Sequence, residues 1–186
     1  MPRINPVTDP QGQAKELLDA VHGKFGMTPN VIATLAHSPA ALKAYLGFGE
    51  ALGSGSLSAS LREQVAVTVA AANKCEYCAA AHTAIGKMVG ASEEELQSNL
   101  RAESSDAKTR AALVFARSVV ENRGWVSDED VAAVREAGYG DTQIVELVAV
   151  VAINTFTNYF NHIAATEVDF PPVSLPQEAG VGAHCR

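Results

Sequence analysis

The stretch SASLREQVAVTVAAANKCEYCAAAHTAIGKMVG, residues 58–90, decides the fold that we expect. It predicts two helical segments that meet near residues 73–74, with Cys75 at or just before the start of the second helix. On that second helix, Cys75, Cys78 and His82 fall within roughly 60° of one another, because each residue advances about 100°. Two thiols and one imidazole are therefore predicted to share one helix face.

The position of the thiols at a helix start suggests their chemistry. A helix N-terminus favours anions, so it lowers the pKa of a thiol placed there. A Cys-x-x-Cys pair in that position can supply a thiolate that attacks a substrate and then closes a disulfide on itself. In a reducing compartment, paired cysteines are more often catalytic or metal-binding than structural.

Composition limits the class of protein. The chain has 186 residues, of which 47% are apolar and 19% are charged, so it predicts one globular domain over residues 1–186. The net charge of −7 disfavours a nucleic-acid role, because no basic stripe would meet the phosphates. The N-terminal residues lack the apolar core of a signal peptide. The apolar run near residues 145–156 contains Glu146 and Asn154 and is too short to span a bilayer. We therefore expect a soluble, cytoplasmic protein.

Helix start signals recur along the whole chain, which predicts an all-α fold. Thr8-Asp9-Pro10 precedes an amphipathic segment, and Ser92 with Glu95 and Ser127 with Asp130 have capping-box spacing. Asp141 precedes an apolar segment of more than 20 residues without a turn signal, which favours helix over strand. The residues after Val168 are rich in proline and glycine and predict irregular structure. The expected helices lie in residues 11–26, 28–35, 38–53, 58–73, 75–90, 92–100, 106–121, 127–138 and 141–166.

A shift of 80 residues suggests an internal repeat. It places Asn158 and His162 on Cys78 and His82, and Gln143 on Glu63. This interpretation predicts two related helical hairpins, of which the second keeps only polar residues where the first has its thiols.

The cysteine pair has two alternative interpretations. Cys75 and Cys78 can be two small buried apolar residues on a helix face. They can also bind zinc with His82, in which case Glu63 is the available fourth ligand. Structural zinc sites commonly use two paired motifs, and the remaining Cys185 lies beside His184 in the tail, so the spacing favours redox chemistry.

Four other side chains also have two interpretations each. Glu63 follows Ser60 by three residues, so it is either a capping-box acid or a partner of His82. His82 is either a structural histidine on an amphipathic helix or, one turn beyond Cys78, a base that takes a thiol proton. Tyr77 either donates a hydrogen bond near the thiols or packs in the core. His162, beside aromatic residues, either lines the same pocket or is a hydrogen-bonded core histidine.

Glu63, eleven intervening residues and then Cys75-x-x-Cys78-x-x-x-His82 resemble the alkylhydroperoxidase D core of the carboxymuconolactone decarboxylase family. TPNVIATLAHSP at 28–39, INTFTNYFNHIA at 153–164 and VDFP at 168–171 are similar to its "peroxidase-related" branch. The resemblance covers roughly residues 10–172. Alkylhydroperoxidase D carries a histidine where this chain has Tyr77, and the decarboxylase branch usually lacks the cysteine pair.

The resemblance implies an all-helical fold with a duplicated hairpin, assembled as a homo-oligomer, often a trimer or hexamer. It also implies peroxide reduction through the cysteine pair, with electrons from a thiol or a lipoyl or thioredoxin-like partner and without metal, flavin or haem.

The mechanism that we expect on this basis assigns one role to each of four residues. His82, polarised by Glu63, prepares the thiols for ionisation; Cys78 attacks the peroxide, and Cys75 then forms the disulfide. The helix-terminus argument alone would instead favour Cys75 as the attacking thiol. Two other function classes remain open: an adaptor that passes electrons to a separate peroxidase, and a redox-responsive assembly without catalysis.

Overall fold

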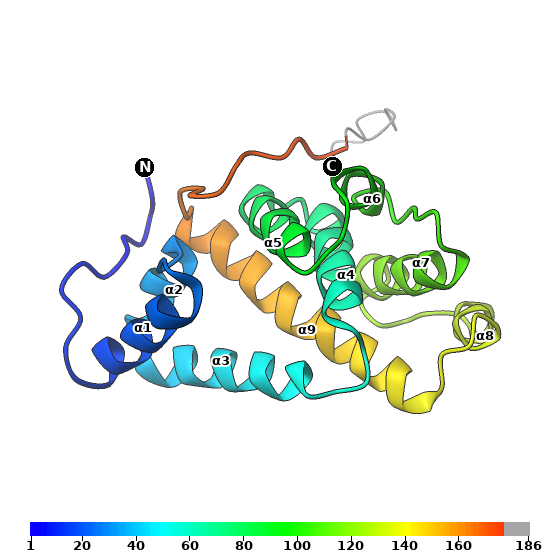
Figure 1. The fold of residues 1–186 in the computed structure, drawn as a ribbon, viewed down its shortest axis with the longest axis horizontal. Helices are drawn as coiled ribbons and strands as arrows, with labels where there is room; N and C mark the ends of the chain where they lie inside the picture. Colours follow the sequence, from blue (N-terminus) through cyan, green and yellow to red (C-terminus); the bar gives the residue numbers. More distant parts are fainter. Residues whose placement is uncertain (177–186) are drawn as a thin grey trace, which may run out of the picture.

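The computed structural model describes residues 1–176 and, within them, folds the chain into helices without strands (Figure 1). The helices are α1 (Gly12–Phe25), α2 (Asn30–Leu35), α3 (Pro39–Gly53), α4 (Ala59–Ala72), α5 (Glu76–Met88), α6 (Glu93–Asn99), α7 (Ala107–Glu121), α8 (Asp128–Glu136) and α9 (Asp141–Ala164). The all-α prediction is confirmed. Residues 168–176 have no regular structure, as expected, while Cys185 and His184 lie outside the described residues.

Helix α4 is the centre of the fold. It packs against α5, α6, α7 and α9, and its residues from Gln64 to Ala70 are all buried. A helix that is covered on every side has an apolar run in place of a single stripe. This explains the valine- and alanine-rich sequence VAVTVAAA that follows Gln64.

The buried residues form two clusters on either side of α4. One joins α1, α2, α3, α5 and α6 and contains both Cys75 and Cys78. The other joins α4, α7, α8 and α9 around Leu113, Leu147 and Val150. The thiols therefore lie inside packed structure, between α5 and the C-terminal half of α9.

Within residues 1–176, five helix starts have a side-chain oxygen as cap, and those at Ser92 and Ser127 are predicted by the sequence. Ser38, Ser58, Ser92, Asp106 and Ser127 each accept a hydrogen bond from a backbone N–H three residues later. Ser127 and Asp130 form the complete predicted capping box.

Three helices differ in detail from the prediction at their N-termini. Helix α1 begins at Gly12 with Gln11 as its N-cap, one residue later than predicted, and α9 has Gly140 as its N-cap, with Asp141 as the first helical residue. The side chain of Glu95 does not return to Ser92 but accepts hydrogen bonds from Gln64 and Asn99. Tertiary partners therefore take this carboxylate away from its local capping position.

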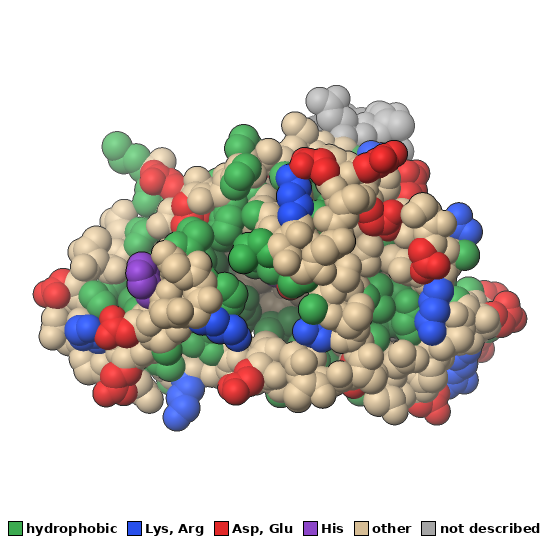
Figure 2. All heavy atoms as spheres, in the orientation of Figure 1, with side chains coloured by type: hydrophobic (Ala, Val, Ile, Leu, Met, Phe, Trp, Pro, Cys, Tyr) green, Lys and Arg blue, Asp and Glu red, His purple; other side chains and the backbone are tan. Residues whose placement is uncertain are grey.

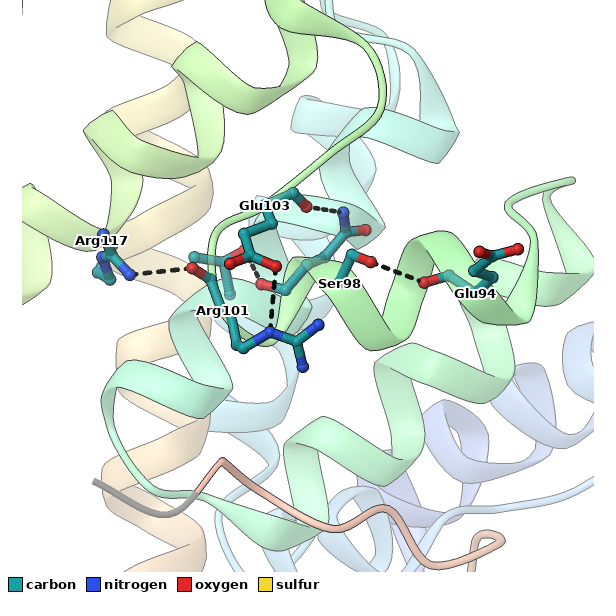
Figure 3. A network of polar contacts seen from close by, with 7 residues as sticks. Glu94, Ser98, Arg101, Glu103 and Arg117 are labelled. Atoms are coloured by element: carbon teal, nitrogen blue, oxygen red, sulfur yellow. Dashed lines mark hydrogen bonds and ion pairs between the residues drawn. The ribbon is translucent and has the colours of Figure 1, made fainter. Parts of the chain in front are cut away.

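Polar contacts hold the connection from α6 to α7 (Figure 3). Arg101 Nε donates to Glu103 at 3.1 Å, and Arg117 Nη1 on α7 donates to the Arg101 carbonyl at 2.9 Å. The buried Asn99 donates to the Glu103 carbonyl, and its own carbonyl accepts from Thr68 of α4. These hydrogen bonds give partners to backbone carbonyl groups of the turn.

The predicted 80-residue repeat is wrong. Glu63 and Cys78 lie on two different helices of a hairpin, α4 and α5, whereas Gln143 and Asn158 lie on the single continuous helix α9. The polar residues in α9 follow from the packing of this helix against the thiols, described below, and not from a second hairpin.

Helix α9 is also longer than the apolar run that we considered too short for a membrane. Its 24 residues are long and apolar enough to cross a bilayer by length and composition alone. It nevertheless packs against α2, α3, α4, α5 and α7 and buries the polar residues Asn154, Thr157, Asn158 and Asn161. These contacts are those of a core helix in a helical protein.

Candidate functional site

The turn between α4 and α5 places the first thiol at a helix start. Lys74 adopts a positive φ of 56°, and the next amide, Cys75 N, bonds back to the Ala70 carbonyl at 2.8 Å. Cys75 is the N-cap of α5, and its Sγ accepts the N–H of Cys78 at 3.5 Å. The prediction that Cys75 stands at or just before the helix start is confirmed. A sulfur in this position replaces the usual cap oxygen.

Both thiols are buried, and helix α9 contacts the second. The exposed fraction is 1% for Cys75 and 3% for Cys78, and both are free thiols. Asn161 Nδ2 donates to Cys78 Sγ at 3.2 Å, and Thr157 Oγ1 lies 3.9 Å from the same sulfur. Cys78 is thus held between its own helix and two polar side chains of α9.

Glu63 and His82 meet across the α4–α5 hairpin. Glu63 Oε2 lies 2.7 Å from His82 Nδ1, and both side chains are partly buried. The N-cap of α4 is Ser58, not Ser60, so the capping-box interpretation of Glu63 is wrong. The hydrogen bond on Nδ1 leaves Nε2 as the ring nitrogen that can exchange a proton with a neighbour.

The surroundings shift the pKa values of the two thiols in opposite directions. The hydrogen bond from Cys75 is the main cause that lowers the pKa of Cys78 to about 6; burial opposes it, and the His82 charge and Asn161 add to it. The same hydrogen bond, together with burial, raises the pKa of Cys75 far above its usual range. The two pKa shifts have opposite directions, which makes Cys78 the more acidic thiol and Cys75 the hydrogen-bond donor.

The imidazole is biased toward its charged form. Burial lowers the pKa of His82, but the carboxylate of Glu63 outweighs burial, and the pKa is raised overall. A thiolate at Cys78 raises it further. A cation is thus held beside the thiolate by a carboxylate on the neighbouring helix.

Tyr45 of α3 lies near enough to the site to feel the charges of Cys78 and Glu63, and sequence reasoning missed it. Burial, followed by the charges of Cys78 and Glu63, raises the pKa of Tyr45. Its ring also contacts Phe156 of α9, with centroids 6.2 Å apart. Only the packing of α3 against α9 brings this phenol to the site, so no local signal in the sequence marks it.

Figure 2 shows a recess lined by hydrophobic side chains near the centre of the visible face, over the region where α3, α5 and α9 meet in Figure 1. The contact between Tyr45 and Phe156 joins α3 to α9 in this region. Two other surface hollows, one along α7 and α8 and one between α1 and the N-terminal segment, include none of the four predicted catalytic residues.

The hydroxyl of Tyr77 bonds to α2 and to the C-terminal segment and, within residues 1–176, makes no hydrogen bond to the thiols. Its hydroxyl accepts the N–H of Val31 at 3.2 Å and donates to Asp169 Oδ1 at 2.7 Å. Its ring packs edge-on against Phe170. Asp169 Oδ2 in turn accepts the N–H of Asn30. Tyr77 thus ties the C-terminal segment to the start of α2.

Both interpretations of His162 are wrong. The residue is exposed, and the contact that it makes with Arg3 uses its backbone carbonyl. Its neighbour Asn161 faces Cys78 instead. Asn161 and His162 lie about 100° apart around the axis of α9, so only one of them can face the thiols. A signal for the correct face was present: polar residues interrupt the apolar helix at helical spacing, at 154, 157, 158 and 161.

A metal interpretation has little support from side-chain geometry. Within residues 1–176, no group of three or more His, Cys, Asp or Glu side chains is arranged to hold a metal ion. Glu63 binds His82 through Nδ1, which makes these two residues an acid–imidazole pair.

Part of the chain matches a known protein family. Residues 39–122 match the model of the carboxymuconolactone decarboxylase family. The resemblance seen in the sequence is therefore confirmed for the segment that carries Glu63, Cys75, Cys78 and His82. No curated protein matches the sequence.

Solved structures extend the likeness to nearly the whole chain. An uncharacterized peroxidase-related protein from Silicibacter sp. TM1040 is 25% identical, with a TM-score of 0.79 over 92% of this chain and 93% of that one. An alkylhydroperoxidase core protein from Ralstonia eutropha JMP134, also peroxidase-related, is 26% identical, with a TM-score of 0.77 over 89% and 93%. The debrominase Bmp8, 19% identical with a TM-score of 0.78 over 90% and 91%, has the same fold.

Proposed function

We propose that the protein is a thiol-dependent peroxidase that reduces hydrogen peroxide or organic hydroperoxides through Cys78 and Cys75. One observation carries the proposal: two buried free thiols lie one helical turn apart at the start of α5, where Cys78 accepts a hydrogen bond from Asn161 and Glu63 contacts His82 at 2.7 Å. The likeness to peroxidase-related proteins at 25% and 26% identity supports it.

The reaction has two steps with balanced atoms and electrons. The Cys78 thiolate attacks the terminal oxygen of the hydroperoxide, an S–O bond forms, and the O–O bond breaks. The departing alkoxide takes a proton from the His82 imidazolium and leaves as alcohol, or as water when the substrate is hydrogen peroxide. Sulfur has then been oxidised by two electrons and the peroxide reduced by two.

Cys75 completes the cycle as the resolving thiol. Its sulfur attacks the Cys78 sulfenic acid, the S–O bond breaks, and the hydroxide leaves as water with the Cys75 proton. An external dithiol, which we propose to be a small thiol or a lipoyl or thioredoxin-like protein, then reduces the disulfide. Glu63 contributes by keeping His82 protonated and oriented.

Stopped-flow addition of hydrogen peroxide and an organic hydroperoxide to the reduced protein tests the proposal. We expect loss of two thiols per chain and a Cys75–Cys78 linkage in digested peptides. Cys75→Ser should stop at a sulfenic acid that a dimedone probe traps, and Cys78→Ser should not react. A cysteine pair that stays reduced under excess peroxide would refute the proposal.

Assays on the same reduced protein distinguish two other activities from the peroxidase. An adaptor would exchange its disulfide with a dithiol protein but leave peroxide intact. The likeness to the debrominase Bmp8, solved with 2,3,4-tribromopyrrole, makes brominated pyrroles a necessary comparison substrate, although 19% identity supports only the fold. Peroxide consumption with an inert brominated pyrrole favours the peroxidase.

We also propose that the protein is a cytoplasmic homo-oligomer, with a trimer or hexamer expected. Its support is an exposed apolar stripe along α9 made of Val145, Val148, Phe156, Tyr159 and Ile163. Light scattering at micromolar concentration should give a multiple of the 19.5 kDa chain, and Tyr159→Asp should reduce it. A monomeric wild-type protein would refute the assembly. Its size before and after oxidation tests the redox-responsive alternative.

A further inference from the structure

Two asparagines of α9 face the thiols, each with one hydrogen-bonding atom unused. Asn158 is 0% exposed and Asn161 is 4% exposed. Asn158 Oδ1 accepts a hydrogen bond from Asn73 Nδ2 at 2.9 Å, while its own Nδ2 has no partner among the described residues. Asn161 Nδ2 donates to Cys78 Sγ, while its Oδ1 has no partner there. The pair therefore presents one free donor and one free acceptor.

The orientation of both amides is determined by neighbouring groups. Asn73 lies at the C-terminal end of α4, directly before the turn that carries Cys75, and its contact makes Asn158 point Nδ2 away from the turn. The contact with sulfur orients Asn161. The Asn158 amide also faces Cys78 and helps to lower the pKa of that thiol, although no hydrogen bond of normal geometry joins Asn158 Nδ2 to the sulfur. Both unused atoms thus belong to the surroundings of Cys78.

Buried polar atoms without a partner are destabilising, so they are uncommon unless a ligand satisfies them. A neighbouring buried asparagine on the same helix gives the contrast. Asn154 Nδ2 donates to the Val150 carbonyl, so this side chain is used within the helix itself. On α9, the unused amide atoms are those of Asn158 and Asn161, one to two turns further along and beside the reactive sulfur. Elsewhere in the described residues, an unused side-chain oxygen also occurs on Thr83, Asn99 and Thr166.

We propose that Asn158 Nδ2 and Asn161 Oδ1 together bind the hydroxyl oxygen that Cys78 attacks, which rests on the proposed peroxidase function. A free donor and a free acceptor match one O–H group, which both accepts and donates a hydrogen bond. The terminal O–H of a hydroperoxide has this character, and so does the sulfenic acid that it leaves on Cys78. A dialkyl peroxide has no O–H group, so it cannot donate a hydrogen bond to Asn161 Oδ1.

The proposal assigns this pair a defined part in the chemistry. Asn158 donates to the oxygen while the S–O bond forms and the O–O bond breaks, and both electrons of the O–O bond leave with the alkoxide. The transferred oxygen keeps its proton and donates a hydrogen bond to Asn161 Oδ1. The site therefore selects hydroperoxides over dialkyl peroxides and holds the sulfenic acid until Cys75 attacks.

The test compares peroxide reactivity with reactivity toward a probe that needs no oxygen site. Wild type and Asn158→Ala are treated at pH 9 with hydrogen peroxide and, separately, with iodoacetamide, under conditions where the Cys78 thiolate is fully formed. Loss of one hydrogen bond to an uncharged oxygen typically costs about tenfold. We expect the peroxide rate to fall by about that factor and the alkylation rate to change less than about threefold.

Matched variants separate this role from packing. Asn154→Ala removes a buried amide of the same helix and should leave both rates unchanged. Asn158→Asp keeps the oxygen that accepts from Asn73 and removes the donor, so it should show the same selective loss even if the alanine variant folds poorly. Di-tert-butyl peroxide, a dialkyl peroxide, should not react with the wild type.

The outcomes are distinguishable. Wild-type protein that does not react with any hydroperoxide would refute the proposed function itself. Wild-type protein that reacts, with Asn158 variants indistinguishable from Asn154→Ala or losing both rates in parallel, would overturn this inference alone. Rapid reaction with the dialkyl peroxide would overturn the selection for an O–H group.

Discussion

Replacement of Glu63 by glutamine tests the electrostatic logic of the site. Gln keeps the shape of the side chain and an oxygen for the bond to His82 Nδ1, which spans 2.7 Å, but removes the charge. Without the carboxylate, burial lowers the pKa of His82, so the imidazole becomes neutral at pH 7. Cys78 then loses the cation beside its thiolate and keeps its hydrogen bonds from Cys75 and Asn161.

The expected magnitude follows from the lowered pKa of Cys78, about 6 in the wild type. Loss of one nearby opposite charge typically moves a pKa by 1–3 units, and we take about one unit because the hydrogen bonds remain. At pH 6 the thiolate fraction then falls about fivefold, at pH 5 almost tenfold, and at pH 9 it hardly changes. The melting temperature should change little.

The assay is the rate of iodoacetamide labelling against pH, with tandem mass spectrometry to locate the label on Cys78. Glu95→Gln is the matched control, because Glu95 is also a partly buried acid but bonds to Gln64 and Asn99 rather than to an imidazole. Its labelling profile should coincide with that of the wild type. If the Glu63→Gln profile also coincides, Glu63 does not control the charge of His82, and the site consists of three residues rather than four.

Three other outcomes are expected. His82→Gln should slow peroxide reduction by about 10²–10⁴-fold while the fold persists, since it removes the proton donor to the leaving oxygen; an unchanged rate would make His82 a packing residue. The folded pKa of Cys78 is lowered from 9.0 to about 6, so its stabilising contribution is full above pH 9 and is lost as the pH falls through 6. The free energy of unfolding in urea should therefore increase more for the wild type than for Cys78→Ser between pH 6 and pH 9. A difference between the two proteins that does not change with pH would contradict the lowered pKa. Gly86→Ala places a Cβ 2.7 Å from Leu96 Cδ2 and should cost about 1–3 kcal/mol in unfolding free energy, whereas Gly23→Ala, with nothing within 4 Å, should not destabilise the protein.

The sequence by itself determined the local features of this protein. Serine and aspartate caps, together with apolar residues at helical spacing, predict most of the helices, because these signals act within a few residues. The Cys-x-x-Cys spacing places Cys75 at the N-cap of α5 and Cys78 one turn later for the same reason. His82 follows one turn beyond, so the two thiols and the imidazole were predictable as a group.

The partners of that group were decided only by tertiary structure. Glu63 meets His82 because α4 and α5 fold back on each other; the local spacing of Glu63 was equally compatible with a capping box, so the sequence alone did not choose between the two contacts. Tyr45 and Asn161 come from α3 and α9, far away along the chain.

The orientation of α9 shows why periodicity alone was insufficient. This helix has one apolar stripe against the core and another, with Val145, Phe156 and Tyr159, exposed. A helix that is apolar on two sides does not specify which side is buried, since either face could supply the hydrophobic contact. Packing against α4 and α5 made the choice, and it turned Asn161 toward the thiol and His162 toward the surface.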